Sequence, residues 1–152
     1  MRWVKDDIQT YKKGKEYFDT VIVPVIPFHL SQDAELDKST SLSEVMNILA
    51  HEIEKELSGR VLLIPGYHYI KQSDKEEEVK RINSWVEDIQ KQPFNHIFFL
   101  TFDPSWKKYE RELEGNLLWL PGIQSDNIHS DEMHSMIRNQ VAQIGELIRS
   151  YW

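Results

Sequence analysis

Two histidines and one aspartate stand near the ends of apolar segments, and their side chains could bind a divalent metal. His29 and His68 each come shortly after an Ile-Pro pair, and Asp103 directly follows an apolar run. Two imidazoles and a carboxylate suit a divalent cation and leave coordination positions for water. A metal held there would lower the pKa of its water towards about 7 and support hydrolysis. The alternative is that both histidines are partly exposed loop residues that bond to the backbone.

The pairing of the two histidines depends on which proline marks the end of the first predicted strand. If the strand leaves through Pro27, His29 aligns with His68 on the adjacent strand, since neighbouring strands lie about 4.8 Å apart. If it leaves through Pro24, His29 lies several residues beyond the strand end and the pairing weakens. Both alignments stay open.

Aromatic side chains gather at the same strand exits and could form a binding surface. Tyr and Trp bury apolar area while keeping a polar tip satisfied, which is typical of binding sites. The alternative for each of them is a place in the core. The predicted binding residues are Phe28, Tyr67, Tyr69, Trp106 and Gln124, with Phe102 and Trp119 close by.

Common catalytic motifs are missing from the chain. There is no G-x-G-x-x-G, no phosphate loop, no G-x-S-x-G elbow and no H-E-x-x-H. With no cysteine, thiolate chemistry and disulfides are excluded as well. These absences favour a protein that works by binding over an enzyme.

The charge balance limits the partners. Asp and Glu number 25 against 18 Lys and Arg, so the surface repels nucleic acid and anionic lipid. The charged N-terminus is unlike a signal peptide, and no apolar run reaches the roughly 18 residues of a membrane span. We expect a cytoplasmic protein that binds neither nucleic acid nor membrane.

Alternating apolar strands and amphipathic helices must position these residues. Parallel strands joined by helical crossovers account for this alternation. The sequence predicts one α/β domain over residues 1–152, a three-layer sandwich of about four mainly parallel strands with helices on both faces, flavodoxin-like or Rossmann-like. The predicted strands are Thr20–Ile26, Arg60–Pro65, His96–Phe102 and Leu117–Leu120.

The helices are predicted from capping residues and apolar stripes. An opening helix covers Asp6–Lys13. Capping boxes begin one helix at Ser41, which ends at Gly59, and another at Ser73, which stops before Pro93. Asp103 and Ser130 are the predicted N-caps of the last two helices.

Two segments fit this scheme poorly. Pro24 lies inside the first strand and removes a ladder hydrogen bond, so that strand should lie at an edge or end early. The polar segment Ser31–Ser39 is long for a loop between strand and helix. It is a candidate lid or binding loop, or else a tolerated surface loop.

Several segments together resemble the YpiF-type family of small uncharacterised proteins of spore-forming bacilli. They are Trp3, Lys15–Thr20, Ile22–Pro27, Ile64–Tyr69 and Leu120–Gln124. The resemblance covers the whole chain and implies a cytoplasmic bacterial protein. The family has no assigned activity, so it transfers no functional residue.

The sequence favours a binding or regulatory domain that acts through the rim at the carboxyl ends of the strands, with a protein or small molecule as partner. The rival is a metal-dependent hydrolase using His29, His68 and Asp103. The apolar stripe of the last helix, which includes Met133 and Ile148, could also serve a homodimer.

Overall fold

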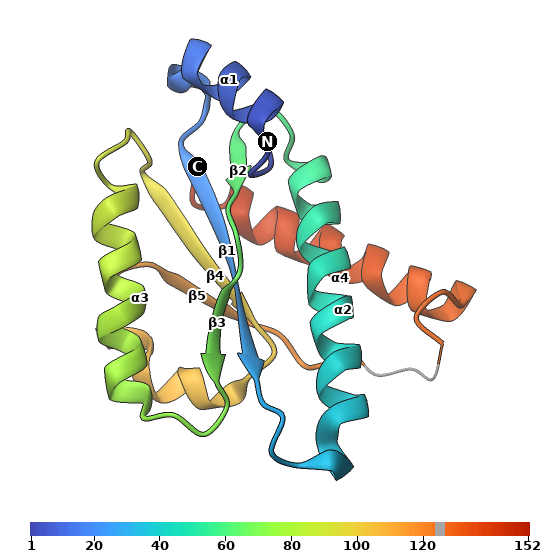
Figure 1. Cartoon of the computed structure of the whole chain (residues 1–152). Coiled ribbons are helices and arrows are strands. Elements are labelled where there is room, and N and C mark those ends of the chain that lie inside the picture. Colours follow the sequence, from blue (N-terminus) through green and yellow to red (C-terminus); the bar gives the residue numbers. More distant parts are fainter. Residues whose placement is uncertain (124–126) are drawn as a thin grey trace.

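The strands form one parallel sheet at the centre of the computed structural model, which describes residues 1–123 and 127–152. The long strand β1 is central, with β2 and β3 along one side of it and β4 and then β5 on the other. Every pairing is parallel, so all the strands run in the same direction, and β1 and β3 end at the lower edge of the sheet in Figure 1. The strands are β1 (Thr20–Phe28), β2 (Val61–Leu63), β3 (Tyr67–Ile70), β4 (His96–Thr101) and β5 (Asn116–Trp119).

Helices cover both faces of this sheet. On one face, α2 and α4 pack against strand residues such as Ile22 and Phe98. On the other, α1, α3 and the 3-10 helix η2 pack against Val21 and Phe99. Alternate strand residues thus enter opposite cores, as the pleat requires. The bounds are α1 (Lys5–Lys13), η1 (Lys15–Tyr17), α2 (Asp33–Glu56), α3 (Lys75–Ile89), η2 (Pro104–Glu112) and α4 (Asp131–Arg149).

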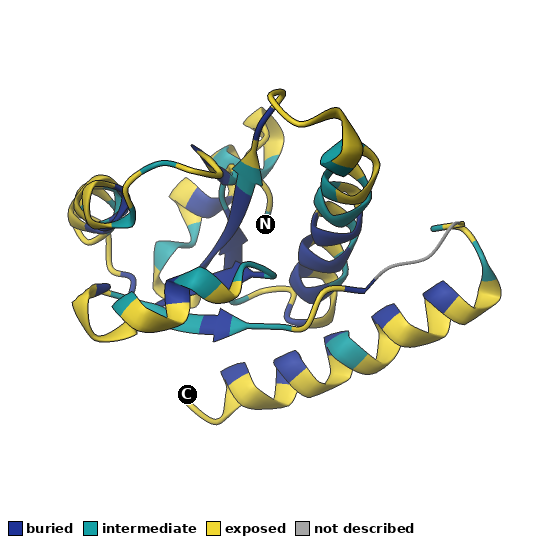
Figure 2. Ribbon diagram, turned by 90° about the horizontal axis from the view of Figure 1, so that it is seen from below, coloured by how far each residue is buried: buried dark blue, intermediate teal, exposed yellow. Residues whose placement is uncertain are grey.

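The three-layer α/β fold predicted from the sequence is confirmed. Viewed from the strand ends, α4 turns a regularly spaced row of buried residues towards the body and leaves its outer side exposed (Figure 2). These buried positions include Met133, Ile137 and Val141, which recur at helical spacing. No helix in the described part of the chain is long and apolar enough to cross a membrane.

Pro24 lies in the central strand, so both outcomes expected of it are wrong. Ile22 is the last β1 residue paired with β2, and Val25 is the first paired with β3. Between these pairs β1 has two residues and its partner has three, Ile64–Gly66, which makes a bulge. The Ile22 carbonyl accepts a hydrogen bond from Ile64 N. A backbone N–H at position 24 would point to the same side of β1, where the partner strand is interrupted. The missing N–H of Pro24 therefore falls at a position where β1 has no regular partner.

The start of α2 is also wrong in the sequence-based assignment. The helix begins at Asp33 and not at Ser41, so most of the predicted Ser31–Ser39 loop is its first two turns. The reason is that its N-cap, Gln32, makes no side-chain cap hydrogen bond and leaves no sequence signal. In α3 the cap is Asp74, whose side chain accepts from Glu76 N, in place of Ser73.

Other boundaries agree with the sequence. The Asp103 side chain accepts from Ser105 N, and that of Ser130 accepts from Met133 N, so both are N-caps as predicted. Gly59 has a φ of +93° and lies just beyond α2, where glycine adopts this conformation without strain.

Candidate functional site

The strand order reverses between β1 and β4. From β1 the chain crosses by α2 to β2 and β3 on one side, and from β3 it crosses by α3 to β4 on the other side. Since α2, which follows β1, and η2, which follows β4, lie on opposite faces, the loops that leave β1 and β4 diverge from each other. Open parallel sheets bind ligands in the crevice at such a switch point, beyond the carboxyl ends of the strands.

A cavity of about 200 Å³ opens at this switch point. We call it the switch-point crevice. Its walls come from the end of β1, the residues after β4, one face of α2 and the residue that follows β3. The lining residues are Val25, Ile26, Pro27, Lys38, Ser39, Leu42, Ser43, Met46, Lys71, Phe102, Asp103 and Pro104.

Cationic and anionic side chains lie at the rim of the crevice. The Lys71 ammonium is 2.8 Å from the Glu35 carboxylate, and this hydrogen bond and charge lower the pKa of Glu35. Within residues 1–123 and 127–152, no hydrogen bond or ion pair engages the Lys38 ammonium. The charge of Lys38 contributes, less than that of Lys71, to the lowered pKa of Glu35, but its ammonium bonds to none of the described residues and can meet a ligand.

Asp103 is already occupied by its neighbours. It accepts from the Tyr69 hydroxyl at 2.5 Å and from Ser105 N at 2.9 Å. Burial opposes its ionisation, but these hydrogen bonds outweigh burial and lower the pKa of Asp103. Burial, and then the bond to Asp103, raise the pKa of Tyr69. Asp103 is thus a charged N-cap that fixes η2 beside the crevice.

His29 contacts the crevice through Ser39. The histidine is 9% exposed and follows β1 directly. Its Nε2 lies 2.9 Å from the Ser39 hydroxyl on α2, and Ser39 lines the crevice. Nδ1 is buried and has no hydrogen-bond partner among the described residues. One imidazole nitrogen is thus joined to a hydroxyl that a ligand can reach.

The predicted metal set is not drawn together. His68 pairs in register with Ile26, is exposed, and bonds through Nδ1 to the Gly66 carbonyl at 3.1 Å. His29 bonds to Ser39, and Asp103 to Tyr69. Across residues 1–123 and 127–152 there is no group of three or more His, Asp or Glu side chains that could hold a metal ion. The metal site therefore gains no support from this geometry.

The predicted aromatic surface divides between core and solvent. Tyr67, Tyr69 and Trp106 are buried in the core that α3 and η2 form with the sheet, and the rings of Tyr69 and Trp106 pack edge to face at 5.3 Å. Phe28 is 48% exposed at the end of β1. Gln124 lies outside the described residues. Tyr69 reaches the crevice only through Asp103.

Sequence reasoning missed the α2 wall of the crevice. Lys38, Ser39, Leu42, Ser43 and Met46 recur at intervals of three and four and therefore share one helix face. That spacing was readable in the sequence. It was overlooked because the first of these positions were assigned to a loop.

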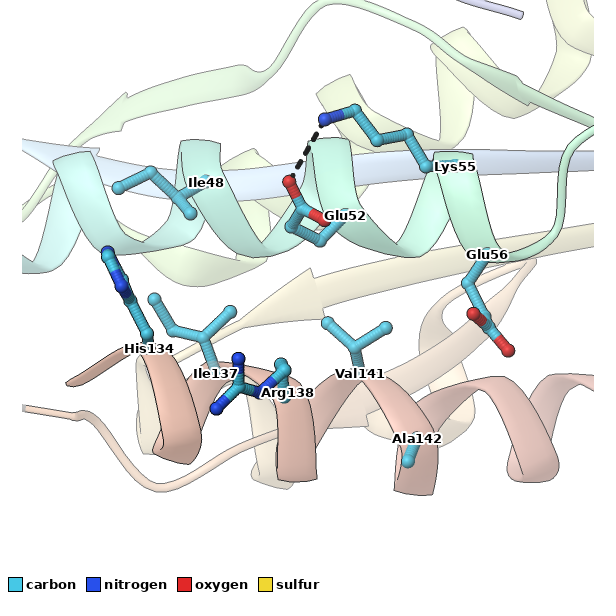
Figure 3. Close-up of a pocket in the computed structure, with 9 residues that line it drawn as sticks. All are labelled: Ile48, Glu52, Lys55, Glu56, His134, Ile137, Arg138, Val141 and Ala142. Atoms are coloured by element: carbon cyan, nitrogen blue, oxygen red, sulfur yellow. Dashed lines mark hydrogen bonds and ion pairs between the residues drawn. The ribbon is translucent and has the colours of Figure 1, made fainter. Parts of the chain in front are cut away.

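A larger hollow of about 660 Å³ runs between α2 and α4 (Figure 3). Ile48, Ile137 and Val141 form its floor, and charged side chains such as Glu52 and Arg138 stand along its edges. It lies along the helices, away from the strand ends. We read this α2–α4 groove as an incompletely filled helix seam.

The fold and the crevice define a parallel α/β protein with an open switch point. The chain belongs to the family described as a protein of unknown function (DUF2487), whose model matches residues 9–152. It is 24% identical to "Uncharacterized protein YpiF" of Bacillus subtilis (strain 168), over all of this chain and 98% of that protein. No solved structure matches. The resemblance found in the sequence is confirmed.

Proposed function

We propose that this protein binds a small molecule with an apolar body and an anionic group in the switch-point crevice. The observation that carries the proposal is the position of the cavity. It lies where the chain leaves β1 and β4 towards opposite faces of the sheet. The sequence favoured the whole rim at the carboxyl ends of the strands as the binding surface, and we restrict it to this crevice.

The lining determines the class of ligand. Leu42, Met46 and Phe102 offer an apolar wall, and Pro27 and Pro104 extend it. Binding sites of this kind are mostly apolar with a few placed polar groups. At about 200 Å³ the cavity is smaller than the roughly 300–1,000 Å³ typical of larger ligands, so a single ring or short chain is its size limit.

The charged residues of the crevice determine which charge the polar group of the ligand should carry. Asp103 is held by Tyr69 and Ser105, and Lys71 by Glu35. The Lys38 ammonium then favours a carboxylate, with the hydroxyl of Ser43 beside it as a hydrogen-bond donor, since the Ser39 hydroxyl bonds to His29. Benzoate, which has one ring and one carboxylate, is the matching probe.

Titration with benzoate, followed through backbone amide resonances, tests the proposal. We expect saturable shifts concentrated at Lys38–Ser43 and around Phe102. Ser43→Leu fills the cavity and should abolish them, whereas Ser84→Leu, an exposed helix position on α3, should not. Shifts that do not saturate, or that survive Ser43→Leu unchanged, would refute binding in the crevice.

A further inference from the structure

We propose that Ser39 is a nucleophile activated by His29, and that the protein transfers the acyl group of a small carboxylic ester to water. This inference rests on the proposed function, because it places the reacting ester in the switch-point crevice. It assigns a reaction to a serine that lies outside any common hydrolase motif.

The first support is geometric. A nucleophile and its base should lie within about 2.6–3.2 Å of each other, and the Ser39 oxygen is 2.9 Å from His29 Nε2. The base is 9% exposed, whereas Ser39 is one of the residues that line the cavity. The imidazole is thus shielded from water while the serine faces the ligand.

The second support is that the contact allows the direction that general-base catalysis needs. With the ring proton on Nδ1, which is buried without a partner in the described part of the chain, the Ser39 hydroxyl donates to His29 Nε2. In the proposed reaction His29 has this tautomer. This is the tautomer that a general base requires.

The third support is the charge around the pair. Lys38 precedes Ser39, lines the same cavity and offers an unengaged ammonium for the oxyanion that forms during acyl transfer. Glu35 lies one helical turn before Ser39, and its pKa is lowered first by Lys71 and to a smaller degree by His29. Its negative charge is therefore in range to stabilise the imidazolium.

The reaction balances with water as the only co-reactant. The Ser39 oxygen bonds to the ester carbonyl carbon and gives its proton to His29 Nε2. The bond from that carbon to the leaving oxygen breaks, and Nε2 returns the proton to release an alcohol. Water then gives a proton to Nε2 and attacks the acyl carbon, the bond to Ser39 breaks, and the serine oxygen takes the proton back. The products are an alcohol and a carboxylic acid, which is the ligand class proposed above.

The test uses p-nitrophenyl acetate on the full chain, with release of p-nitrophenol followed by absorbance and the acetylated residue mapped by mass spectrometry. We expect a rapid burst and an acetyl group on Ser39. Ser39→Ala should abolish both, and Ser41→Ala, two residues along the same helix and outside the crevice, should change neither. His29→Gln should slow the burst by about 100-fold or more.

Circular dichroism of each variant shows whether it folds, and Ser39→Ala decides the question if His29→Gln does not fold. Acetylation of lysines alone, or a burst that persists in Ser39→Ala, would overturn the inference. If benzoate still binds in that case, the proposed function stands without the reaction. If benzoate binding also fails, both fall.

Discussion

The two ends of the sheet differ in how completely their polar groups are paired. At the end where the strands begin, the N-terminal ammonium is 2.6 Å from the Glu54 carboxylate, and Arg60 bonds to both oxygens of Asp19 at 2.8 Å. The Trp152 indole N–H donates to the Thr20 hydroxyl at 2.8 Å, and the Arg60 guanidinium lies 3.9 Å from the Trp152 ring centre. Both chain termini are thereby fastened to this end.

The end where the strands finish is left open. No hydrogen bond or ion pair engages the exposed Lys38 ammonium among the described residues, and Nδ1 of the buried His29 has no hydrogen-bond partner there. Between them lies a cavity of about 200 Å³. A buried polar group without a partner, as His29 Nδ1 is, typically costs about 1–3 kcal/mol of free energy. Such a cost at one end alone indicates that stability is concentrated where the strands begin and ligand contacts where they end.

Trp152→Ala should have the largest effect, on stability alone. It removes the indole, its hydrogen bond to Thr20 and its contact with Arg60 at the closed end. We expect the free energy of unfolding to fall by about 2–3 kcal/mol. This loss is at or below the low end of the range for Trp→Ala substitutions in a core, because the Trp152 side chain is partly exposed. Urea denaturation measures it, and benzoate affinity should not change.

Trp3→Ala is the matched control, because Trp3 is 61% exposed. Its substitution should change the free energy of unfolding by less than about 0.5 kcal/mol. Equal losses in the two variants would show that the contacts of Trp152 with Thr20 and Arg60 do not stabilise the fold.

Lys38→Met should act in the opposite sense. Removing the ammonium while keeping the alkyl stem should weaken benzoate binding about tenfold, which is about 1.4 kcal/mol, and leave the free energy of unfolding unchanged. Calorimetric titration checks the affinity. Lys80→Met, on the exposed face of α3, should bind benzoate like the unmodified chain. An unchanged benzoate affinity in Lys38→Met would show that the Lys38 charge does not contribute to binding.

The smallest expected effect is the pH dependence of the closed end. The hydrogen bond from Arg60 lowers the pKa of Asp19 against an opposing effect of burial. Because the folded pKa lies below the unfolded value of about 3.9, the pair stabilises the fold above that pH and loses its contribution as pH falls through the folded pKa. Asp19→Asn should cost no more than about 1 kcal/mol at neutral pH, since the pair is partly exposed. Denaturation at pH 7 and pH 3 measures the difference in the free energy of unfolding between the unmodified chain and Asp19→Asn. This difference should be smaller at pH 3, and an equal difference at both pH values would contradict the pairing.

The parallel sheet could be predicted because short apolar runs mark β1, β2, β4 and β5, and amphipathic segments of helical length lie between most of them. β3 was missed because Tyr67 and Tyr69 are buried whereas His68 and Ile70 are exposed, an alternation hidden in the short segment after Pro65. The break between β2 and β3 depends on Pro24, in another strand. A pairing between distant segments leaves no local pattern.

The sequence indicated where two of the candidate residues lie in the fold, but not which residues they contact. His29 and Asp103 were expected just after the first and third predicted strands, and the structure has them after β1 and β4. The hypothesis of a metal site paired His29 with His68, whereas the fold pairs His29 with Ser39 on α2. That contact could not be anticipated while Ser31–Ser39 was assigned to a loop.

The central claim is that the switch-point crevice, and not the larger α2–α4 groove, holds the ligand. Nuclear Overhauser effects between the ring protons of bound benzoate and the methyl groups of the protein test it most directly. We predict contacts to the methyls of Leu42 and Met46, which line the crevice. Contacts to Ile48 and Val141, which line the groove, would contradict the account.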